Sequence, residues 1–229
     1  MAIRLTVYGR REWLGLSALA ALCCAGLAFA AWAWSPLALL GLAVVLPVWG
    51  WVLWFFRDPC RRVPSEPGLF ISPADGRVTD ITQLGSDSPL GRPGVAVGIF
   101  MSVFDVHVNR SPCDARVEKV VHNDGLYLDV RLPRAWAANE AATIHLAYSH
   151  NQAALPVVVR QVAGLVARRI VTDLKPGQQV TRGGYIGMIK FGSRLELMVP
   201  AELAPQVCVQ IGQRVLAGET ILVRVEENG

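Results

Sequence analysis

The run Met188–Leu197, MIKFGSRLEL in one-letter code, decides how the rest of this chain is interpreted. Both sides of its Gly192-Ser193 pair have the composition of β-strands. Glycine leaves its carbonyl open to approach and adopts backbone geometries closed to other residues. If the fold strains this peptide bond, the Ser193 hydroxyl can attack the Gly192 carbonyl and form an ester. Elimination would leave a ketone at the new N-terminus, a cofactor made from the chain itself. The alternative is an ordinary strand kink or turn.

The N-terminal quarter has the composition of a membrane segment. The chain of 229 residues is 52% hydrophobic and 17% charged, with a mean hydropathy of +0.37, which is too apolar for an ordinary soluble domain. No charged residue occurs in the range 13–56. Residues 14–34 and 37–56 are each long enough to cross a bilayer as a helix, with Ser35-Pro36 as the turn. We therefore expect a basic leader at 1–12, followed by a membrane hairpin of two apolar helices.

The charges that flank this hairpin predict its orientation. Basic residues lie on both outer sides of the hairpin: Arg10, Arg11, Arg57, Arg61 and Arg62. The turn between the two helices contains none. The positive-inside rule then places both ends in the cytoplasm and the hairpin in the cell (inner) membrane. A cleaved signal peptide would have a much shorter apolar region. A re-entrant or interfacial hairpin is the other alternative, since Pro36 and Pro47 would keep the segment shallow.

Short apolar runs separated by Gly, Pro and Asp fill the range 63–229 and predict a compact, mainly β domain. Its 167 residues suffice for one core of ordinary size. The stretch 157–171 is rich in β-branched residues and interrupted by Gly164, which favours two strands or one bent strand over a helix. The predicted strands are 69–72, 76–84, 94–100, 105–109, 115–121, 143–148, 156–171, 179–190, 194–199, 206–211 and 220–225.

The chain contains a short internal repeat, formed by residues 175–180, KPGQQV, and residues 211–219, IGQRVLAGE. Each segment has a Gly turn, then a Val three positions later. Such a repeat is similar to the hammerhead turns of biotinyl and lipoyl carrier domains. It favours a fold with hammerhead or barrel-like units.

Cysteine usage and charge limit the classes of partner. The five cysteines show no metal-ligand spacing and no disulfide framework, so we expect reduced thiols and no metal. The net charge of +4 suits an anionic membrane surface. No basic cluster interleaved with aromatic residues and no nucleic-acid-binding motif is present, so no nucleic acid partner is expected.

His107 is the histidine in the most suggestive setting. In the run 100–112, FMSVFDVHVNRSP, strand alternation places Asp105, His107 and Asn109 on one face. If that face lines a pocket, His107 is a general acid or base and Asp105 orients it. Otherwise the three residues form a solvated strand face.

Three further charged residues are candidates for a site. Asp75 lies in ISPADGRV, residues 71–78, where an Asp-Gly turn is the ordinary explanation. Arg110 and Arg194 offer guanidinium forks that bind a phosphate or carboxylate of a substrate, although an arginine beside a strand is more often simply exposed. No P-loop, dinucleotide fingerprint, zinc pattern or nucleophile elbow is present.

Five segments in this order and spacing resemble a known family: WFFRDP (54–59), ISPADGRV (71–78), FMSVFDVHVNRSP (100–112), VAGLVARRIV (162–171) and IKFGSR (189–194). Together they are similar to the short bacterial and archaeal branch of the phosphatidylserine decarboxylases. These are self-cleaving pyruvoyl enzymes of phosphatidylethanolamine synthesis.

The resemblance implies cleavage between Gly192 and Ser193 into a β chain of 1–192 and an α chain of 193–229, with Ser193 becoming the pyruvoyl group. Phosphatidylserine in the membrane would form a Schiff base with this group, which accepts electrons as carbon dioxide leaves. Hydrolysis would then release phosphatidylethanolamine. His107 matches the family histidine suited to the acid–base step, and Asp75 matches an aspartate of self-cleavage. The sequence is compatible with a homo-oligomer.

Two departures limit what the resemblance carries over. In the longer branch a second histidine follows the first by three positions, where this chain has Arg110. In that branch the second histidine would serve as the base that activates the serine for self-cleavage. In this chain either His107 or backbone strain must take over that function. The segment 138–142, ANEAA, lacks the Asn-Glu-Arg-Asn run of the short branch, which leaves the contacts of Asn139 and Glu140 open.

Two rival functions make different predictions. A membrane-tethered carrier or adaptor domain of the biotinyl or lipoyl type requires a modified lysine at a hammerhead tip and an uncut chain. Neither Lys175 nor Lys190 stands in an obvious acceptor motif. A pyruvoyl decarboxylase of a soluble amino acid would not need the apolar anchor, and its activity would survive removal of residues 1–56.

Overall fold

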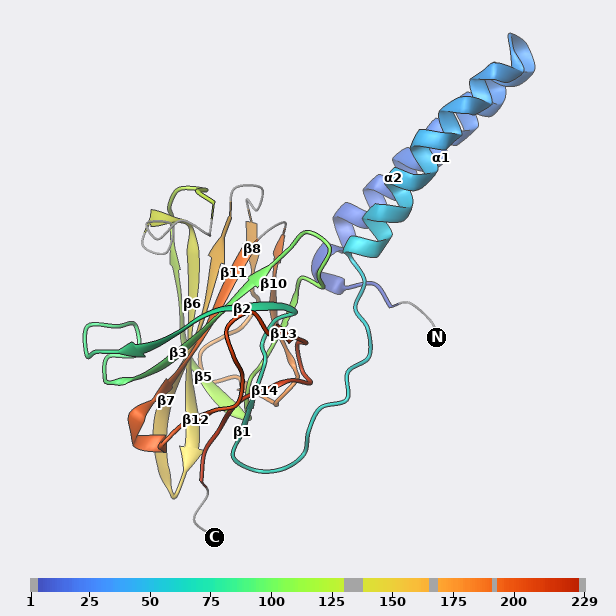
Figure 1. Ribbon diagram of the computed structural model, residues 1–229. Coiled ribbons are helices and arrows are strands. Elements are labelled where there is room, and N and C mark those ends of the chain that lie inside the picture. The colour runs from blue at the N-terminus through green and yellow to red at the C-terminus, as the bar shows by residue number, and fades with distance from the viewer. Residues whose placement is uncertain (1–3, 130–137, 165–168, 191–192, 227–229) are drawn as a thin grey trace. The chain divides into compact units, whose positions relative to one another are not determined.

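A computed structural model of the protein describes residues 4–129, 138–164, 169–190 and 193–226 (Figure 1). The chain forms two compact units, Met1–Cys60 and Arg61–Gly229. In the first unit, helical segments follow one another as η1 (Val7–Gly9), α1 (Arg10–Ala33), η2 (Pro36–Gly41) and α2 (Leu42–Phe55).

The predicted turn begins the second half of the hairpin. Ser35 accepts a hydrogen bond from the backbone N–H of Leu37 on its Oγ at 3.3 Å, and Pro36 occupies the first position of η2, where its missing N–H costs nothing. A side-chain bond from Trp49 Nε1 to Ser17 Oγ, 3.0 Å long, joins α2 to α1. The helices therefore pair as an antiparallel hairpin.

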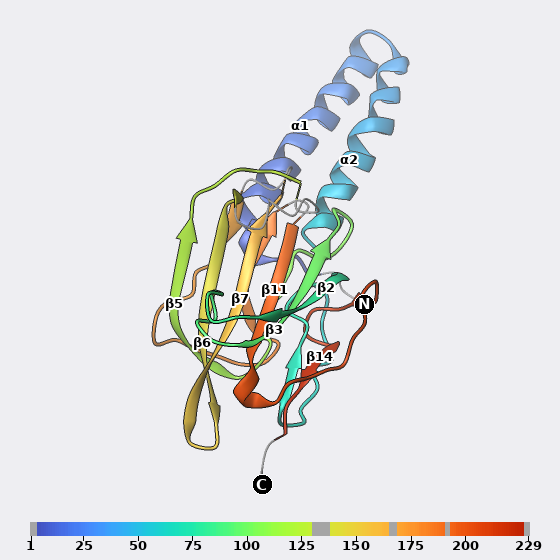
Figure 2. The ribbon, with the colours of Figure 1, turned by 60° about the vertical axis from the view of Figure 1, so that its left-hand side comes forward.

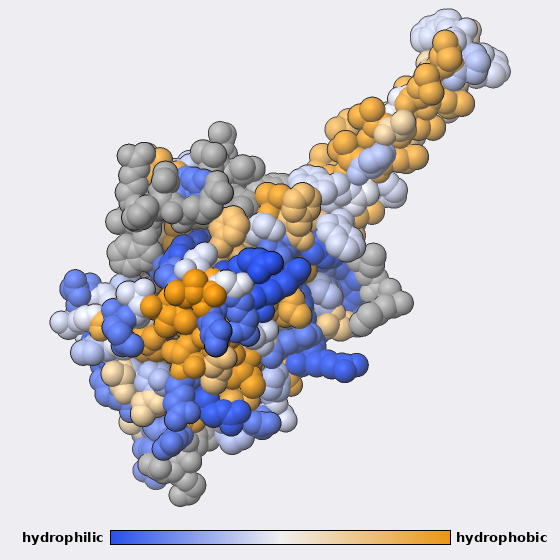
Figure 3. Space-filling view, in the orientation of Figure 1, coloured by the Kyte–Doolittle hydropathy of each residue, from blue (hydrophilic) through white to orange (hydrophobic). Residues whose placement is uncertain are grey.

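Both halves of the hairpin are long and apolar enough to cross a membrane, Val7–Ala33 with 27 residues and Pro36–Phe55 with 20. α1 buries none of its residues, and α2 buries only Val52 and Phe55. Figure 3 shows hydrophobic surface along both helices. Helices that are apolar all round belong in apolar surroundings. The predicted helical hairpin is confirmed, and its composition suggests association with a membrane.

Among the described residues, the second unit contains three antiparallel sheets (Figures 1 and 2). The largest has eight strands in the order β13–β2–β3–β11–β7–β6–β5–β9. Their bounds are β2 (Gly76–Leu84), β3 (Gly94–Met101), β5 (Ala115–Asn123), β6 (Ala141–His150), β7 (Ala153–Ala163), β9 (Gln179–Val180), β11 (Ser193–Pro200) and β13 (Arg214–Val215).

Two three-stranded sheets complete the unit. Their orders are β1–β14–β12 and β4–β10–β8. The bounds are β1 (Leu69–Ile71), β4 (Val108–Arg110), β8 (Arg169–Val171), β10 (Tyr185–Lys190), β12 (Gln206–Val207) and β14 (Ile221–Arg224), with a 3-10 turn η3 (Ala201–Leu203) after β11.

Strand β11 holds the centre of the large sheet. It pairs along its whole length with β3, and from Ser193 to Met198 with β7. Successive side chains alternate between the two faces, so Leu195, Leu197 and Val199 enter the main apolar core, whereas Arg194 and Glu196 lie on the opposite face. Since both neighbours of β11 are distant in sequence, long-range pairing places Ser193.

The internal repeat of residues 175–180 and 211–219 corresponds to a repeated structure. Gly177 and Gly212 have φ of 85° and 86°, a left-handed conformation that glycine adopts without strain. Each turn leads into a two-residue strand, β9 or β13, and these two strands occupy opposite edges of the large sheet. The prediction of a mainly β fold with repeated turn units is confirmed.

The prediction for residues 105–109 is wrong in part. Only β4 (Val108–Arg110) is strand, and residues 102–107 form a turn and coil. Every residue of the range 106–110 is buried, so the expected alternation between a polar face and an apolar face is absent there. The strand β13 was not predicted, because two residues are too few to show the alternation of polar and apolar side chains typical of a strand. The predicted strand 156–171 is divided into β7 and β8.

Candidate active site

Ser193 is the first residue of β11 and is fully buried. It lies between Met101 of β3 and Ala163 of β7. Its Oγ donates a hydrogen bond to the Sδ of Met101 at 3.4 Å. A thioether is a weak acceptor, so this contact holds the hydroxyl loosely. Gly192, the other half of the predicted cleavage site, lies outside the described residues.

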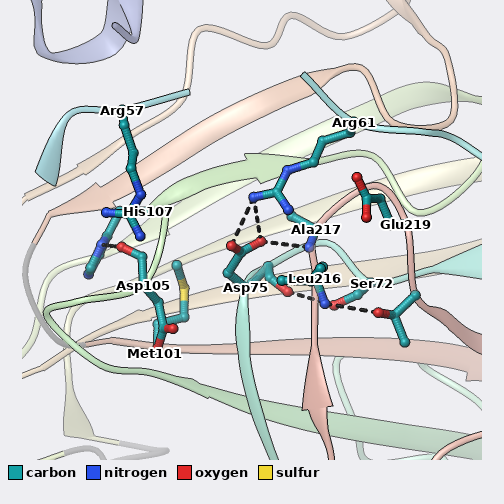
Figure 4. Close-up of polar contacts among 12 residues, drawn as sticks. Arg57, Arg61, Ser72, Asp75, Met101, Asp105, His107, Leu216, Ala217 and Glu219 are labelled. Carbon is teal, nitrogen blue, oxygen red and sulfur yellow. Dashed lines mark hydrogen bonds and ion pairs between the residues drawn. The ribbon is translucent and has the colours of Figure 1, made fainter. Parts of the chain in front are cut away.

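His107 is also fully buried and directly precedes β4. Its Nδ1 lies 2.9 Å from the backbone carbonyl oxygen of Asp105 (Figure 4). A carbonyl oxygen only accepts, so Nδ1 is the donor in this contact, and in the neutral form of such a ring Nε2 is the atom with the lone pair. The backbone N–H of Ile189 donates to the His107 carbonyl at 3.4 Å. The ring is thus held through Nδ1, on a segment tied to β10.

Asp105 contacts His107 through its backbone carbonyl and not through its side-chain carboxylate. The Asp105 carboxylate accepts hydrogen bonds from the backbone N–H and the Oγ of Ser102, both at 2.8 Å. The turn that these bonds close presents the Asp105 carbonyl to His107. The sequence pointed to the right residue, but its backbone makes the contact.

Two amide side chains extend the buried polar cluster. Gln161 of β7 donates from Nε2 to the Oδ1 of Asn109 at 2.8 Å, and the Nδ2 of Asn109 makes a long contact of 3.8 Å to Met101 Sδ. Asn109 and Ser193 therefore share one sulfur atom. The Oε1 of Gln161 has no hydrogen-bond partner among the described residues. Sequence reasoning missed Gln161 and Met101, although a glutamine inside the valine-rich segment 157–163 was a detectable signal.

Asn139 ties the loop before β6 to the neighbour of Ser193. Its Nδ2 donates to the carbonyls of Ala163 at 2.7 Å and Leu128 at 2.8 Å, and the N–H of Ala163 donates to the carbonyl of Glu140 at 2.9 Å. Ala163 is the cross-strand partner of Ser193. The segment that departs from the short-branch pattern thus supports the strand end where Ser193 lies.

Asp75 lies in the turn between β1 and β2 and is buried, with 4% of its surface exposed. Its carboxylate receives two hydrogen bonds from Arg61 Nη2, at 2.8 and 2.9 Å, and one from the Ala217 N–H at 2.8 Å (Figure 4). Burial raises the pKa of Asp75 and outweighs the opposing effect of Arg61 and the Ala217 N–H, while repulsion by Asp105 adds to the rise. Asp75 therefore takes up a proton more readily than an ordinary aspartate.

Arg110 belongs to the neighbourhood of Asp75. Its Nη1 donates to the Gly183 carbonyl at 2.9 Å, and its guanidinium lies 4.7 Å from the ring centroid of Tyr185. A Cβ added to Gly218 would approach the side chains of both Arg110 and Arg61 to within 3.1 and 3.3 Å. The predicted role of Arg110 as a substrate ligand stays a prediction.

Replacing Asp75 with asparagine is expected to lower the free energy of unfolding by about 3–5 kcal/mol, because the buried Arg61 loses its carboxylate. Denaturant unfolding of the full chain in detergent measures the change, with Ser193→Ala present throughout so that every chain is uncut. The matched control is Glu202→Gln, which breaks the exposed ion pair with Arg92 and is expected to cost at most about 1 kcal/mol. Equal losses in the two variants would contradict the prediction.

Arg194 follows Ser193 but lies on the other face of the sheet. Its guanidinium donates to both carboxylate oxygens of Asp80, at 2.6 and 2.7 Å, and to Glu196 Oε1 at 2.8 Å. The fork expected to hold a substrate anion thus binds two carboxylates of the chain. Although burial alone would raise the pKa of Asp80, hydrogen bonds from Arg194 and Thr79 and the charge of Arg194 lower it.

The lowered pKa of Asp80 predicts how the protein responds to acid. The ionised carboxylate contributes stability that is present above its unfolded pKa of about 4 and is lost as the pH falls through the lower folded value. The melting-temperature difference between the unmodified protein and Asp80→Asn should therefore be largest near neutral pH and shrink below roughly pH 4. Asp87→Asn, at an exposed carboxylate, is the control. A difference independent of pH would contradict the assignment.

Known proteins of one family match most of this chain. The family model described as phosphatidylserine decarboxylase matches residues 49–223. The phosphatidylserine decarboxylase proenzyme of Paramagnetospirillum magneticum is 40% identical over 196 residues, covering 84% of this chain and 78% of its own. The proenzyme of Nitrobacter winogradskyi is 40% identical over 199 residues, with 86% and 77% covered. That of Beijerinckia indica is 43% identical over 194 residues, with 83% and 79% covered.

Proposed function

Because this chain belongs to the phosphatidylserine decarboxylase family, we propose that it converts membrane phosphatidylserine into phosphatidylethanolamine with a pyruvoyl group made from Ser193. The observation that carries the proposal is the placement of Ser193. Its hydroxyl is fully buried at a strand start, in one polar cluster with Met101, Asn109 and Gln161. The proenzyme names of the relatives support self-processing.

In the proposed cleavage, the Ser193 Oγ attacks the carbonyl carbon of Gly192 and the Ser193 nitrogen leaves, which gives an ester. Removal of the Ser193 α-proton then breaks the ester bond and separates chains 1–192 and 193–229. Hydrolysis of the resulting enamine releases ammonia and leaves the ketone. A base must take the hydroxyl proton, and His107 with its lone pair at Nε2 is the base we assign. Asp75, held by Arg61 and the Ala217 N–H, is assigned to the same step.

The residues around Ser193 fit a small group with two carbonyls. The site is buried and polar, and the N–H groups of its amide side chains are donors for carbonyl oxygens. The unpartnered Gln161 Oε1 is an acceptor for the amine of a substrate. When formed, the pyruvoyl group supplies an electrophilic carbonyl that accepts the electron pair released as carbon dioxide leaves. His107 then delivers a proton to the carbon that loses the carboxylate, and burial excludes water from this step.

The helical hairpin suits a lipid substrate. Its two apolar segments would keep the enzyme at the cell (inner) membrane, and the flanking arginines favour a cytoplasmic location for both ends. A carrier or adaptor function is less well supported. Lys190 is buried, and Lys175, although exposed, precedes a Pro-Gly turn.

The proposal is tested with purified full-length chain in mixed micelles of detergent and phosphatidylserine. We expect phosphatidylethanolamine and carbon dioxide in equal amounts, measured by lipid mass spectrometry and isotope release. Free L-serine serves as the control substrate and should not be consumed. Decarboxylation of serine with no action on the lipid would favour the soluble amino acid enzyme, and an inactive, uncut chain would favour the carrier or adaptor.

A further inference from the structure

A cavity of about 260 Å³ lies beside the turn that orients His107. It is smaller than the roughly 300–1,000 Å³ of sites that enclose drug-sized ligands, so its size suits a head group rather than a whole lipid. Its walls include Arg77, Phe100, Ser102, Phe104, Asp105 and Arg214.

The cavity has an excess of positive charge. Arg77 and Arg214 are direct cross-strand partners in the pairing of β2 with β13, and like charges in such positions repel. Of the lining residues, one is acidic: Asp105, whose carboxylate lies 3.6 Å from Arg214 Nη2 and already accepts two hydrogen bonds from Ser102. Arg77 donates from Nη1 to the Gly212 carbonyl at 2.9 Å, and no other hydrogen bond from the Arg77 guanidinium is present among the described residues. An anion between the two guanidinium groups would relieve their repulsion.

The cavity lies at the same end of the large sheet as Ser193. Two of its lining residues, Phe100 and Ser102, flank Met101, and Met101 is the cross-strand partner of Ser193. The same turn lines the cavity with the Asp105 side chain and holds His107 with the Asp105 carbonyl. Phe100 pairs with Arg194, so the wall of the cavity that it forms lies on the face of the sheet opposite to Ser193. A group bound there is linked to Ser193 around the strand end and to His107 through the turn 102–105.

Phe104 gives the cavity an apolar rim. It is 66% exposed, and a large aromatic side chain with that much exposed surface can contact an apolar ligand. Cationic walls beside an exposed aromatic ring match an amphipathic anion, in which a phosphate is joined to a hydrocarbon portion.

On the basis of the proposed function, we propose that Arg77 and Arg214 bind the phosphodiester of phosphatidylserine and that Phe104 packs on its glycerol portion. The phosphodiester keeps its charge throughout the reaction, so binding it lowers KM without opposing the chemical step. An arginine on the substrate carboxylate would instead stabilise the charge that must leave as carbon dioxide. The two arginines are thus assigned to substrate binding and not to the proton steps.

The test compares the double variant Arg77→Ala/Arg214→Ala with the unmodified full chain in mixed micelles. We expect KM for phosphatidylserine to rise about 10- to 100-fold, the effect of losing charge-assisted hydrogen bonds. The kcat of the cut enzyme should stay within about two-fold, because the lost contacts bind the substrate and the transition state equally. Cleavage into 1–192 and 193–229, followed by intact mass, reports that the variant folds. Arg77→Lys/Arg214→Lys should recover part of the affinity, and Arg92→Ala, at an exposed arginine, should change nothing.

A binding measurement separates this inference from the proposed function. Calorimetry with glycerophosphoserine, the deacylated head group, should detect binding to the unmodified chain and a comparable loss in the double-alanine variant. Binding that depends on both arginines would support the subsite even if phosphatidylserine were not decarboxylated. Unchanged KM and unchanged binding in the double variant would overturn it. Inorganic phosphate bound as tightly as glycerophosphoserine would identify a free-phosphate site and overturn the lipid assignment.

Discussion

Replacing Ser193 with alanine is expected to leave one uncut chain of full mass and to abolish decarboxylation. The substitution removes both the nucleophile of the proposed cleavage and the atoms that become the pyruvoyl group. The buried position has space for the smaller side chain, and the hydroxyl that is lost contacts only a weak sulfur acceptor among its described partners, so the fold should be retained.

Intact mass spectrometry of protein purified from membranes measures this directly. The unmodified chain should yield a fragment beginning at residue 193 that is lighter than its serine-started form by the mass of ammonia and that resists N-terminal sequencing. Ser111→Ala is the matched control, because it removes another fully buried hydroxyl, one bonded to the Cys113 carbonyl at 2.7 Å. A single uncut chain in the unmodified protein would refute the pyruvoyl mechanism, and cleavage in Ser193→Ala would place it at another bond.

Replacing His107 with asparagine is expected to reduce kcat, per cut chain, by about 10²- to 10⁴-fold, the usual contribution of a general acid or base. The asparagine amide retains a donor near the position of Nδ1 for the Asp105 carbonyl but has no basic atom at the position of Nε2. The variant therefore tests the proton-transfer function more than the packing of the turn.

Cleavage and turnover must be measured separately, cleavage by intact mass and turnover by product formed per cut chain. The pH–rate profile should also lose the limb that reports the imidazole. His122→Asn, at an exposed histidine, is the control. A variant that remains uncut would assign the His107 proton step to cleavage. A variant cut normally and within two-fold of unmodified activity would exclude His107 from both steps.

Local sequence identified some candidate site residues and missed others. The resemblance singled out Ser193, His107 and Asp75, and the structure buries all three. The resemblance did not identify Arg61 as the partner of Asp75. A buried carboxylate requires a partner, but which of the chain's arginines provides it depends on where the segment before β1 runs.

The sequence by itself determined the apolar hairpin, the mainly β fold and the family. Each depends on short-range information: uncharged length, β-branched runs between glycine turns, and motifs in a fixed order. Only the tertiary structure decided that β11 lies between β3 and β7, that the Asp105 carbonyl and not its carboxylate holds His107, and that Gln161 joins Asn109. Arg194 shows the reason most clearly. Its carboxylate partner Asp80 is more than a hundred positions away in the chain, and contacts of that kind arise from long-range strand pairing, which no local pattern encodes.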